Sequence, residues 1–353
     1  MHNISPSITA KRNYKLHNRP DHPVCMLKKY IQQYFFDFQY VDNLSEEVSI
    51  QSNFDELLIP PDHSSRRPTD TYYVDENTIL RTHTSAHQTA LLRQGVRKFL
   101  VTGDVYRKDT IDKTHYPVFH QMEGVKIVEK GDSLDGNPLD GDPLDDLVAT
   151  LKGLMHHLFP GSIYRILEDD FPFTRPSIQI EVKTGKGWME VLGAGVIHPQ
   201  ILKNCQIEGS GWAFGLGIDR LLLQLCQIPD IRYLWTEDVR FLEQFKDGLT
   251  TFREYSRYPA MYRDIAFWVP DYQENEEGLW RQYHDFCSLV RELSTDTIEH
   301  IELLDRYRKN GSTSLAFRIG YRSHERTLTN EEVNHLQAVV RSQVEEQLDV
   351  VLR

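Results

Sequence analysis

The chain lacks any apolar run that approaches the ~20 residues needed to span a bilayer. Apolar residues make up 40% of its 353 residues and charged residues 26%, which is typical of globular proteins that fold in water. We therefore expect a soluble protein. Because a chain of this length exceeds one usual hydrophobic core, the length also favours two domains.

Cysteine is scarce and scattered along the sequence. The residues Cys25, Cys205, Cys226 and Cys287 never form a pair with the close spacing of metal ligands. We therefore expect unpaired thiols in a reducing compartment, and we predict no zinc site.

Positive charge is also in short supply, since 40 Lys and Arg residues stand against 52 Asp and Glu residues and the formal net charge is −12. Neutralising a phosphate backbone requires clustered Lys and Arg, so this balance excludes nonspecific wrapping of nucleic acid but allows a local basic face. Residues 1–10 lack the apolar run of a secretory signal and the Arg-rich amphipathic helix of a transit peptide. We expect any targeting segment to be absent from this sequence.

Strand and helix patterns alternate along the first two thirds of the chain. Runs rich in β-branched and aromatic residues predict strands of an antiparallel sheet, and apolar residues at helical spacing predict the helices between them. The acidic segment 131–146 is rich in Gly and Pro, and we predict a mobile surface loop there. The predicted strands are 78–82, 99–107, 118–128, 177–182 and 188–196, and the predicted helices are 22–38, 83–96, 146–159 and 215–227.

The last hundred or so residues predict a separate small α+β module. Its expected order is strand 261–269, helix 277–293, strands 297–307 and 314–322, and helix 330–348. Acidic residues outnumber basic ones in this part of the chain, so RNA binding would require a one-sided basic face. An ordinary solvated charged face is the alternative. The candidate nucleic-acid-binding residues are Arg306, Arg308, Lys309, Arg318, Arg322 and Arg326.

Two blocks of sequence carry the chemistry. They are GDVYRKDTIDKTHYPVFHQMEG at 103–124 and GWAFGLGIDR at 211–220, and each combines apolar and glycine residues with an arginine, Arg107 or Arg220. A planar guanidinium binds phosphate oxygens in pairs, while glycine lets backbone lie close to a nucleotide and a helix start offers free N–H groups. The two arginines are therefore candidates to hold a bent polyphosphate.

In this order the two blocks resemble motifs 2 and 3 of class II aminoacyl-tRNA synthetases. The segments FHQMEG and FPFT resemble those of phenylalanyl-tRNA synthetases of the single-chain, monomeric organellar type. The segments YPAMYRDIAFWV and YRSHERTLTNEEV extend the resemblance to the ferredoxin-like anticodon-binding domain of these enzymes. The resemblance covers nearly the whole chain. It implies an α+β protein with a class II antiparallel sheet flanked by helices at 1–240, a linker at 241–256 and a ferredoxin-like domain at 257–353.

The resemblance also implies a reaction. The family activates L-phenylalanine with ATP and Mg²⁺ to phenylalanyl-adenylate and pyrophosphate, then transfers phenylalanine to the 2′-hydroxyl of the terminal adenosine of tRNA(Phe). We expect the reaction to serve organellar translation. We also expect that the protein acts without a β subunit and does not bind a membrane. The expected location is the mitochondrial matrix, with a plastid or a dual destination as the alternative.

Site residues follow from the same resemblance. Arg107 and Arg220 are the catalytic candidates, for the reacting α-phosphate and the γ-phosphate, and Glu190 is the candidate to help hold Mg²⁺. Gln121 and Glu123 share one strand face, as required if both meet the α-ammonium group, and small Ala213 leaves room for the ring. The phenylalanine-binding set is Ser85, Ala86, His87, Gln88, Gln121, Met122, Glu123, Phe171, Phe173, Ala213 and Phe214. The ATP-binding set is Arg107, Thr114, His115, Tyr116, Phe119, Glu190, Gly217 and Arg220.

Several alternatives stay open on the sequence alone. His115 could be a solvated loop histidine, and Phe119 a core aromatic instead of a stacking partner for adenine. The whole chain could be a catalytically inactive paralogue, although intact Arg107 and Arg220 favour an active one. It could also be a biotin or lipoyl ligase with a class II-like core, but such an enzyme needs neither FPFT nor an RNA-binding module.

Overall fold

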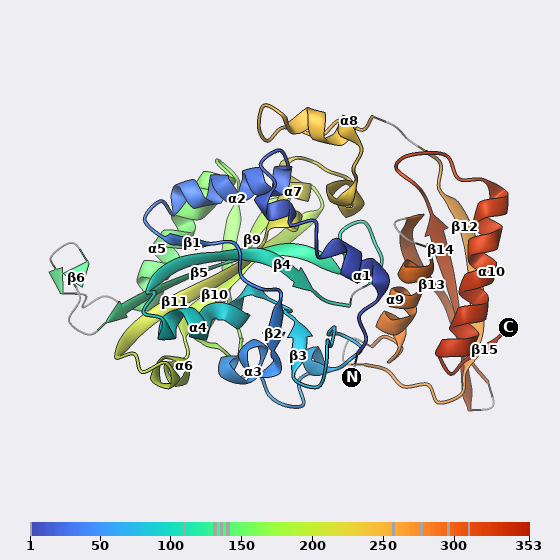
Figure 1. Ribbon diagram of the computed structural model, residues 1–353, viewed down its shortest axis with the longest axis horizontal. Helices are drawn as coiled ribbons and strands as arrows, with labels where there is room; N and C mark the ends of the chain where they lie inside the picture. The colour runs from blue at the N-terminus through green and yellow to red at the C-terminus, as the bar shows by residue number, and fades with distance from the viewer. Residues whose placement is uncertain are drawn as a thin grey trace.

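The structure is a computed structural model. It describes residues 2–108, 110–129, 133–134, 137–138, 142–255, 258–275, 278–294, 297–309 and 311–353. Two sheets organise the molecule, a large one in the first part of the chain and a smaller one near the C-terminus (Figure 1). The mixture of helices with largely antiparallel sheet confirms the expected α+β class.

The large sheet has seven strands in the order β1-β4-β5-β11-β10-β9-β8. Neighbouring strands pair antiparallel throughout, except that β1 runs parallel to β4. The strands are β1 Gln39–Val41, β4 Lys98–Tyr106, β5 Val118–Glu129, β8 Tyr164–Asp169, β9 Thr174–Thr184, β10 Gly187–Ile197 and β11 Gly209–Gly217.

Helices pack on the face of this sheet that carries the main core. They are α2 (Pro23–Tyr34), α5 (Pro143–Leu158) and α7 (Ile218–Leu225), and they contact one another and strands β5, β10 and β11. A second core lies among the short helices α3 (Ile50–Asn53), α4 (Gln88–Arg93) and α6 (Pro199–Asn204). The central strands are therefore buried on both sides, which holds their side chains in fixed positions.

The helix predicted at 215–227 is wrong in its first part. Gly209–Gly217 forms the central strand β11, and the helix α7 begins only at Ile218. A strand that is buried on both faces shows no apolar–polar alternation, so its sequence can be mistaken for part of a buried helix. The strands β1 and β8 and the helix α6 were not predicted, because each is short.

The predicted loop at 131–146 lies mostly outside the described residues. What is described there is the short pair β6 Ser133–Leu134 and β7 Asn137–Pro138. The helix α5 then begins earlier than predicted, at Pro143, because the side chain of Asp142 accepts a hydrogen bond from the Leu144 N–H and caps the helix.

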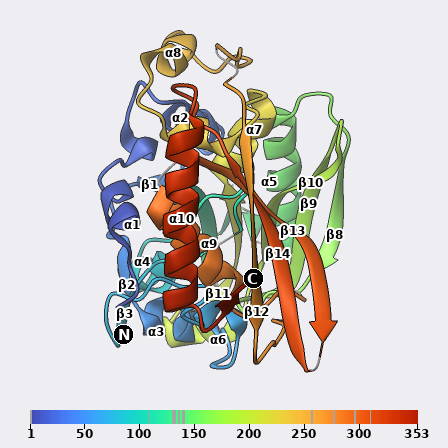
Figure 2. The ribbon, with the colours of Figure 1, turned by 90° about the vertical axis from the view of Figure 1, so that its right-hand side faces the viewer.

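The C-terminal module is a four-stranded sheet with two long helices. Its strand order is β13-β14-β12-β15, and its core joins the sheet to α9 and α10. Figure 2 looks onto this module and shows α10 beside the sheet. The predicted helix 277–293 begins later, at Tyr283. The elements are β12 Met261–Val269, α9 Tyr283–Ser294, β13 Ile298–Lys309, β14 Ser312–Tyr321, α10 Asn330–Gln347 and β15 Val351–Leu352.

The C-terminal module packs against the connection between β4 and β5. Lys108 Nζ lies 2.9 Å from Asp285 Oδ1 on α9, and the Ile301 N–H of β13 donates to the Ile111 carbonyl at 3.0 Å. In Figure 1, α9 lies on the side of its sheet that faces the large unit. The segment that carries Arg107 and Thr114 is therefore held by both units.

Candidate active site

A cavity of about 540 Å³ opens over the central strands of the large sheet. Strand β5 contributes Gln121 and Glu123 to its lining, and β11 contributes Gly215. The register places Glu123 directly opposite Gly215, and a Cβ on that glycine would come within 3.5 Å of the Gln121 amide nitrogen. The absence of a side chain at Gly215 therefore keeps this polar end of the cavity open.

Glu123 is the chemically distinctive residue of the polar end. Its side chain is only 2% exposed, and Oε2 has no hydrogen-bond partner among the described residues. Burial raises the pKa of Glu123 to about 8, although a hydrogen bond with Ser85 acts in the opposite direction. Such a carboxyl group is ready to accept a cationic partner, because pairing would relieve the cost of its buried charge.

The other end of the cavity is aromatic. Phe171 and Phe173 are stacked with their ring centroids 5.6 Å apart and an angle of 4° between the rings. A Cβ on Gly193 would meet the Phe171 ring at 2.8 Å, so glycine is required there for the ring to sit in place. Ala213 and Phe214 complete the lining. The cavity thus joins an apolar, ring-lined end to a carboxyl group.

A second cavity of about 260 Å³ shares Arg107, Gln121, Glu190 and Gly215 with the first. Arg107 donates from Nε to the Thr82 carbonyl at 2.8 Å, and its guanidinium carbon lies 5.3 Å from the centre of the Phe119 ring. All the predicted ATP-binding residues line this cavity: Arg107, Thr114, His115, Tyr116, Phe119, Glu190, Gly217 and Arg220.

Arg220 and Glu190 face one another across this second cavity. Arg220 Nη1 lies 3.6 Å from Glu190 Oε2, and both side chains are about half exposed, at 49% and 48%. The lining of this cavity includes the guanidinium groups of Arg107 and Arg220 and the carboxylates of Glu190 and Asp219, the last of them on a buried side chain. This charge distribution suits a polyphosphate, and the Glu190 oxygens are the kind of ligand that Mg²⁺ prefers.

Four residues of the predicted phenylalanine set do not line the cavity. Met122 is fully buried in the main core, because alternate residues of β5 point to opposite faces of the sheet. Ala86 belongs to the second core, Gln88 is buried outside the lining, and His87 Nε2 lies 2.8 Å from Arg81 Nη1. Burial and Arg81 lower the pKa of His87 to about 4. Of the segment 85–88, only Ser85 reaches the cavity.

The register does not place the candidate tRNA-binding residues of the C-terminal module on one face of its sheet. Across the β13–β14 pair, Arg306 lies opposite Leu315, whereas Arg318 belongs to β14 and lies opposite Asp264 of β12. Residues 315 and 318 point to opposite faces of their strand. Arg318 is also paired with Asp264 at 2.8 Å, and Arg326 with Glu332.

The remaining predicted tRNA-binding residues divide between an interface and an open edge. Arg322 bridges Glu254 and Glu299 where the module meets the rest of the chain, and its side chain is only 16% exposed. Arg308 and Lys309 are exposed at the end of β13. The candidate tRNA-binding residues therefore do not share one surface.

Part of the rim of the larger cavity was missed by the sequence analysis. It comes from Asp70 and nearby residues of the segment 59–71, from Lys108, and from His284 of the C-terminal module. His284 Nδ1 lies 3.5 Å from Asp70 Oδ1. No local pattern marks these residues, since they meet only when the loop and the module fold onto the sheet.

The sequence also indicated no role for His83, although it lies only two residues before the predicted site residue Ser85. It lines the larger cavity, and burial together with the charge of Arg107 lowers its pKa to about 3. Its ring therefore stays neutral at physiological pH.

Two further expectations concern the chain as a whole. All four cysteines are buried and unpaired. Among the residues described, no helix combines the length and the apolar character needed to cross a membrane.

Comparison with known proteins assigns both units. Residues 7–245 match the model of the class II core domain of tRNA synthetases, and residues 256–353 match the ferredoxin-fold anticodon binding domain. The chain is 46% identical to the chloroplastic/mitochondrial phenylalanine–tRNA ligase of Arabidopsis thaliana, over 99% of this chain and 82% of the relative. It is 40% identical to the mitochondrial enzyme of Dictyostelium discoideum (99% and 89%) and 34% identical to that of Saccharomyces cerevisiae (99% and 92%).

Proposed function

Since the chain belongs to the phenylalanine–tRNA ligases, a family of class II tRNA synthetases, we propose that it activates L-phenylalanine with ATP and transfers it to tRNA(Phe). The observation that carries the proposal is the junction of two cavities at Arg107 and Gln121. An aromatic slot with a buried carboxyl group opens there directly into a cleft with two arginines.

Phenylalanine fits the larger cavity in one orientation. Its ring would lie at the end lined by Phe171 and Phe173, where aromatic pairs contribute about 0.5–1.5 kcal/mol each beyond burial. Its ammonium group would meet Glu123 and Gln121 on the single face of β5 that they share. Its carboxylate then points to Arg107, which belongs to both cavities.

The first reaction step follows from this placement. A carboxylate oxygen of phenylalanine attacks the α-phosphorus of ATP in line, the bond to the bridging oxygen breaks, and pyrophosphate leaves. Arg107 would bind the α-phosphate and the carboxylate together, and Arg220 would bind the γ-phosphate. Because the positive charges are in place before the anions approach, they stabilise the transition state without reorganisation. No side chain is required to take up a proton.

Mg²⁺ enters this scheme with ATP. Glu190 would share in holding it, and the ion would neutralise phosphate oxygens during the displacement. Phe119 would stack on the adenine, next to Thr114, His115 and Tyr116.

In the second step the 2′-hydroxyl oxygen of the terminal adenosine of tRNA(Phe) attacks the carbonyl carbon of phenylalanyl-adenylate. The ester bond forms, the bond between the carboxyl group and the phosphate breaks, and AMP and a proton are released. We propose that the domains divide at 1–240, 241–256 and 257–353, and that the last of these binds the distant part of the tRNA. Among its basic residues, Arg308 and Lys309 are the best placed, because they are exposed at one strand end. We propose a monomer without a β subunit, in the mitochondrial matrix or, alternatively, in a plastid or in both.

Phenylalanine-dependent exchange of pyrophosphate into ATP tests the proposal. Exchange should require phenylalanine and should vanish in Arg107→Ala, and charging of tRNA(Phe) should follow. A purified, folded chain that binds tRNA but shows no exchange would establish the inactive paralogue instead.

A further inference from the structure

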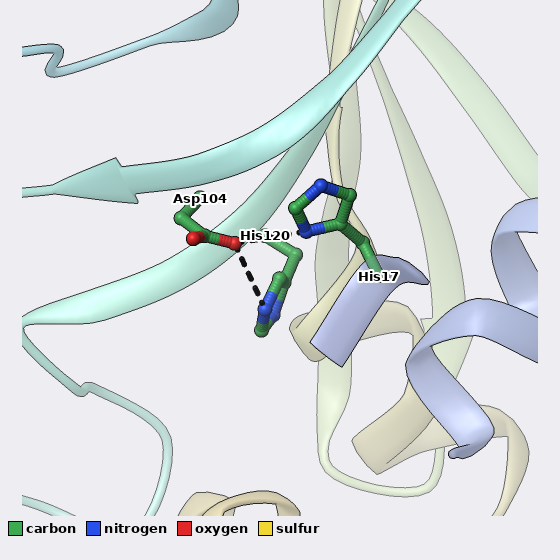
Figure 3. A group of neighbouring side chains, drawn as sticks. All are labelled: His17, Asp104 and His120. Carbon is green, nitrogen blue, oxygen red and sulfur yellow. Dashed lines mark ion pairs between the residues drawn. The ribbon is translucent and has the colours of Figure 1, made fainter. Parts of the chain in front are cut away.

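A buried chain of charged groups runs behind the nucleotide cavity. It begins at His17, passes through Asp104 of β4 and His120 of β5, and ends at Asp219 in the first turn of α7. All four side chains are at most 2% exposed. Figure 3 shows the rings of His17 and His120 on either side of the Asp104 carboxylate. The reaction scheme above uses none of these side chains.

The contacts of His120 determine which atoms carry hydrogen. Its Nδ1 lies 3.0 Å from Asp219 Oδ2, and its backbone N–H donates to the same carboxylate oxygen at 2.6 Å. On the other side of the ring, Nε2 lies 3.4 Å from Asp104 Oδ1. Although burial alone would lower the pKa of His120, the charges of Asp219 and Asp104 raise it above its ordinary value. The ring therefore presents its Nδ1–H to Asp219, whereas Nε2 lies near Asp104 without a hydrogen-bond partner among the described residues.

His17, Asp104 and His120 also have the spacing of a metal site. Positive charge is already supplied at this point, however, because Lys15 Nζ lies 3.2 Å from Asp104 Oδ2. The ion contacts with His17 and His120 hold the pKa of Asp104 well below its usual range, despite its burial. We therefore interpret this group as a set of ion contacts and not as a metal site.

Asp219 connects this cluster to the start of α7, which carries Arg220. The ladder between β5 and β11 ends at the pair Gly217–Gln121. One residue further on the chain turns into α7, and the side chain of Asp219 reaches back to His120. Its neighbour in sequence is Arg220, which has only the long contact of 3.6 Å to Glu190 as an ion pair within the described part of the chain. The direction of Arg220 thus depends on how firmly the start of α7 is fixed.

A second contact links His120 to Tyr116 through the ring of Trp235. Its ring stacks on Trp235 at 5.5 Å, and Trp235 stacks on Tyr116 at 5.3 Å, with an angle of 20° between the rings in both pairs. Tyr116 lines the nucleotide cavity. His120 is therefore connected to the lining of the nucleotide cavity twice, directly by Asp219 and through Trp235 by Tyr116.

We propose that His120 is a positioning residue for ATP, acting through its Nδ1–H and Asp219 to aim Arg220 at the terminal phosphate. The proposal rests on the function proposed above. It assigns a role to a residue that does not touch the substrate, so it predicts an effect on ATP with little effect on phenylalanine.

Two substitutions distinguish the contributions of the two ring nitrogens of His120. His120→Asn places an amide N–H near the position of Nδ1 and should keep the KM for ATP within about threefold of the wild type. His120→Gln places it near Nε2, loses the contact with Asp219, and should raise the KM for ATP about tenfold or more, the range expected for loss of a hydrogen bond to a charged group. The KM for phenylalanine should change less than about twofold in both, since Glu123 and Gln121 remain.

Controls separate positioning from general destabilisation. Leu151→Ala removes a fully buried side chain of α5 in the same core and should lower Tm without changing the KM for ATP. Asp219→Asn keeps the shape of the partner and should give an intermediate KM for ATP, which tests the proposal even if a His120 variant fails to fold.

The outcomes are distinguishable. Equal KM values for ATP in His120→Asn and His120→Gln, or a fall in Tm with no change in that KM, would overturn the positioning role. Absence of exchange in the wild type would instead refute the proposed function, and ATP binding by calorimetry would then still compare the variants.

Discussion

Protonation of Glu123 should control the affinity for phenylalanine near neutral pH. Because the pKa of this buried group is raised to about 8, roughly a tenth of the empty enzyme carries the carboxylate at pH 7. The ammonium group of phenylalanine pairs with the carboxylate and not with the neutral acid. The KM for phenylalanine should therefore fall nearly tenfold from pH 6 to 7 and about fivefold from pH 7 to 8, and then level off.

The substitution Glu123→Gln removes this titration while keeping the size of the side chain. We expect its KM for phenylalanine to exceed that of the wild type at pH 8 by about ten- to a hundredfold, the loss expected for a hydrogen bond between charged groups, and to stay flat between pH 6 and 8. His83 and His87 cannot mimic the effect, since their pKa values are lowered to about 3 and about 4.

Exchange kinetics at several pH values, with ATP saturating, measure these KM values. Calorimetry in buffers of different ionisation enthalpy should in addition detect the release of nearly one proton as phenylalanine binds at pH 7. A wild-type KM that is flat from pH 6 to 8, or a Glu123→Gln variant that keeps the slope, would refute the reasoning.

The same shift has a consequence for stability. The folded protein retains a proton on Glu123 that the unfolded chain has already lost above about pH 4.5. The free energy of unfolding of the empty protein should therefore decrease as pH rises from about 4.5 to about 8, and Glu123→Gln should reduce this slope.

Three further predictions concern residues whose position the structure clarifies. Met122→Leu should change the KM for phenylalanine by less than about twofold in exchange assays, because it repacks a core methionine at nearly constant volume. Ala213→Val should raise that KM strongly with little change in the KM for ATP, since the added methyl groups enter the cavity; an unchanged KM would remove Ala213 from the ring pocket. Arg308→Glu should raise the KM for tRNA in charging assays and leave exchange intact, whereas Arg322→Glu should also lower Tm, because it places a third acid beside Glu254 and Glu299.

Much of the site could be predicted from the sequence because its residues are close together in sequence and regular in spacing. Thr114, His115, Tyr116 and Phe119 line one cavity, and the pair Phe171 and Phe173 lines the other, as their motifs indicated. The rim at Asp70 and His284 could not be predicted, since the two residues are far apart in the chain and meet only across packed units. The faces on which the arginines of the C-terminal module lie could not be predicted either, because a list of arginines does not specify the register that directs each side chain.

The alternation of side chains along strand β5 explains why Met122 does not line the cavity and why no role was predicted for His120. In FHQMEG the side chains of Phe119, Gln121 and Glu123 line the cavities, while Met122 is buried behind the sheet and His120 pairs with Asp219. A strand alternates its faces with a period of two, so one short segment can both contact the substrates and fix the elements around them. A motif read only as a set of ligands assigns Met122 to the wrong face and gives His120 no role. The alternation predicts instead that substitutions at odd positions affect substrate binding directly, whereas those at even positions act through stability or through the direction of Arg220.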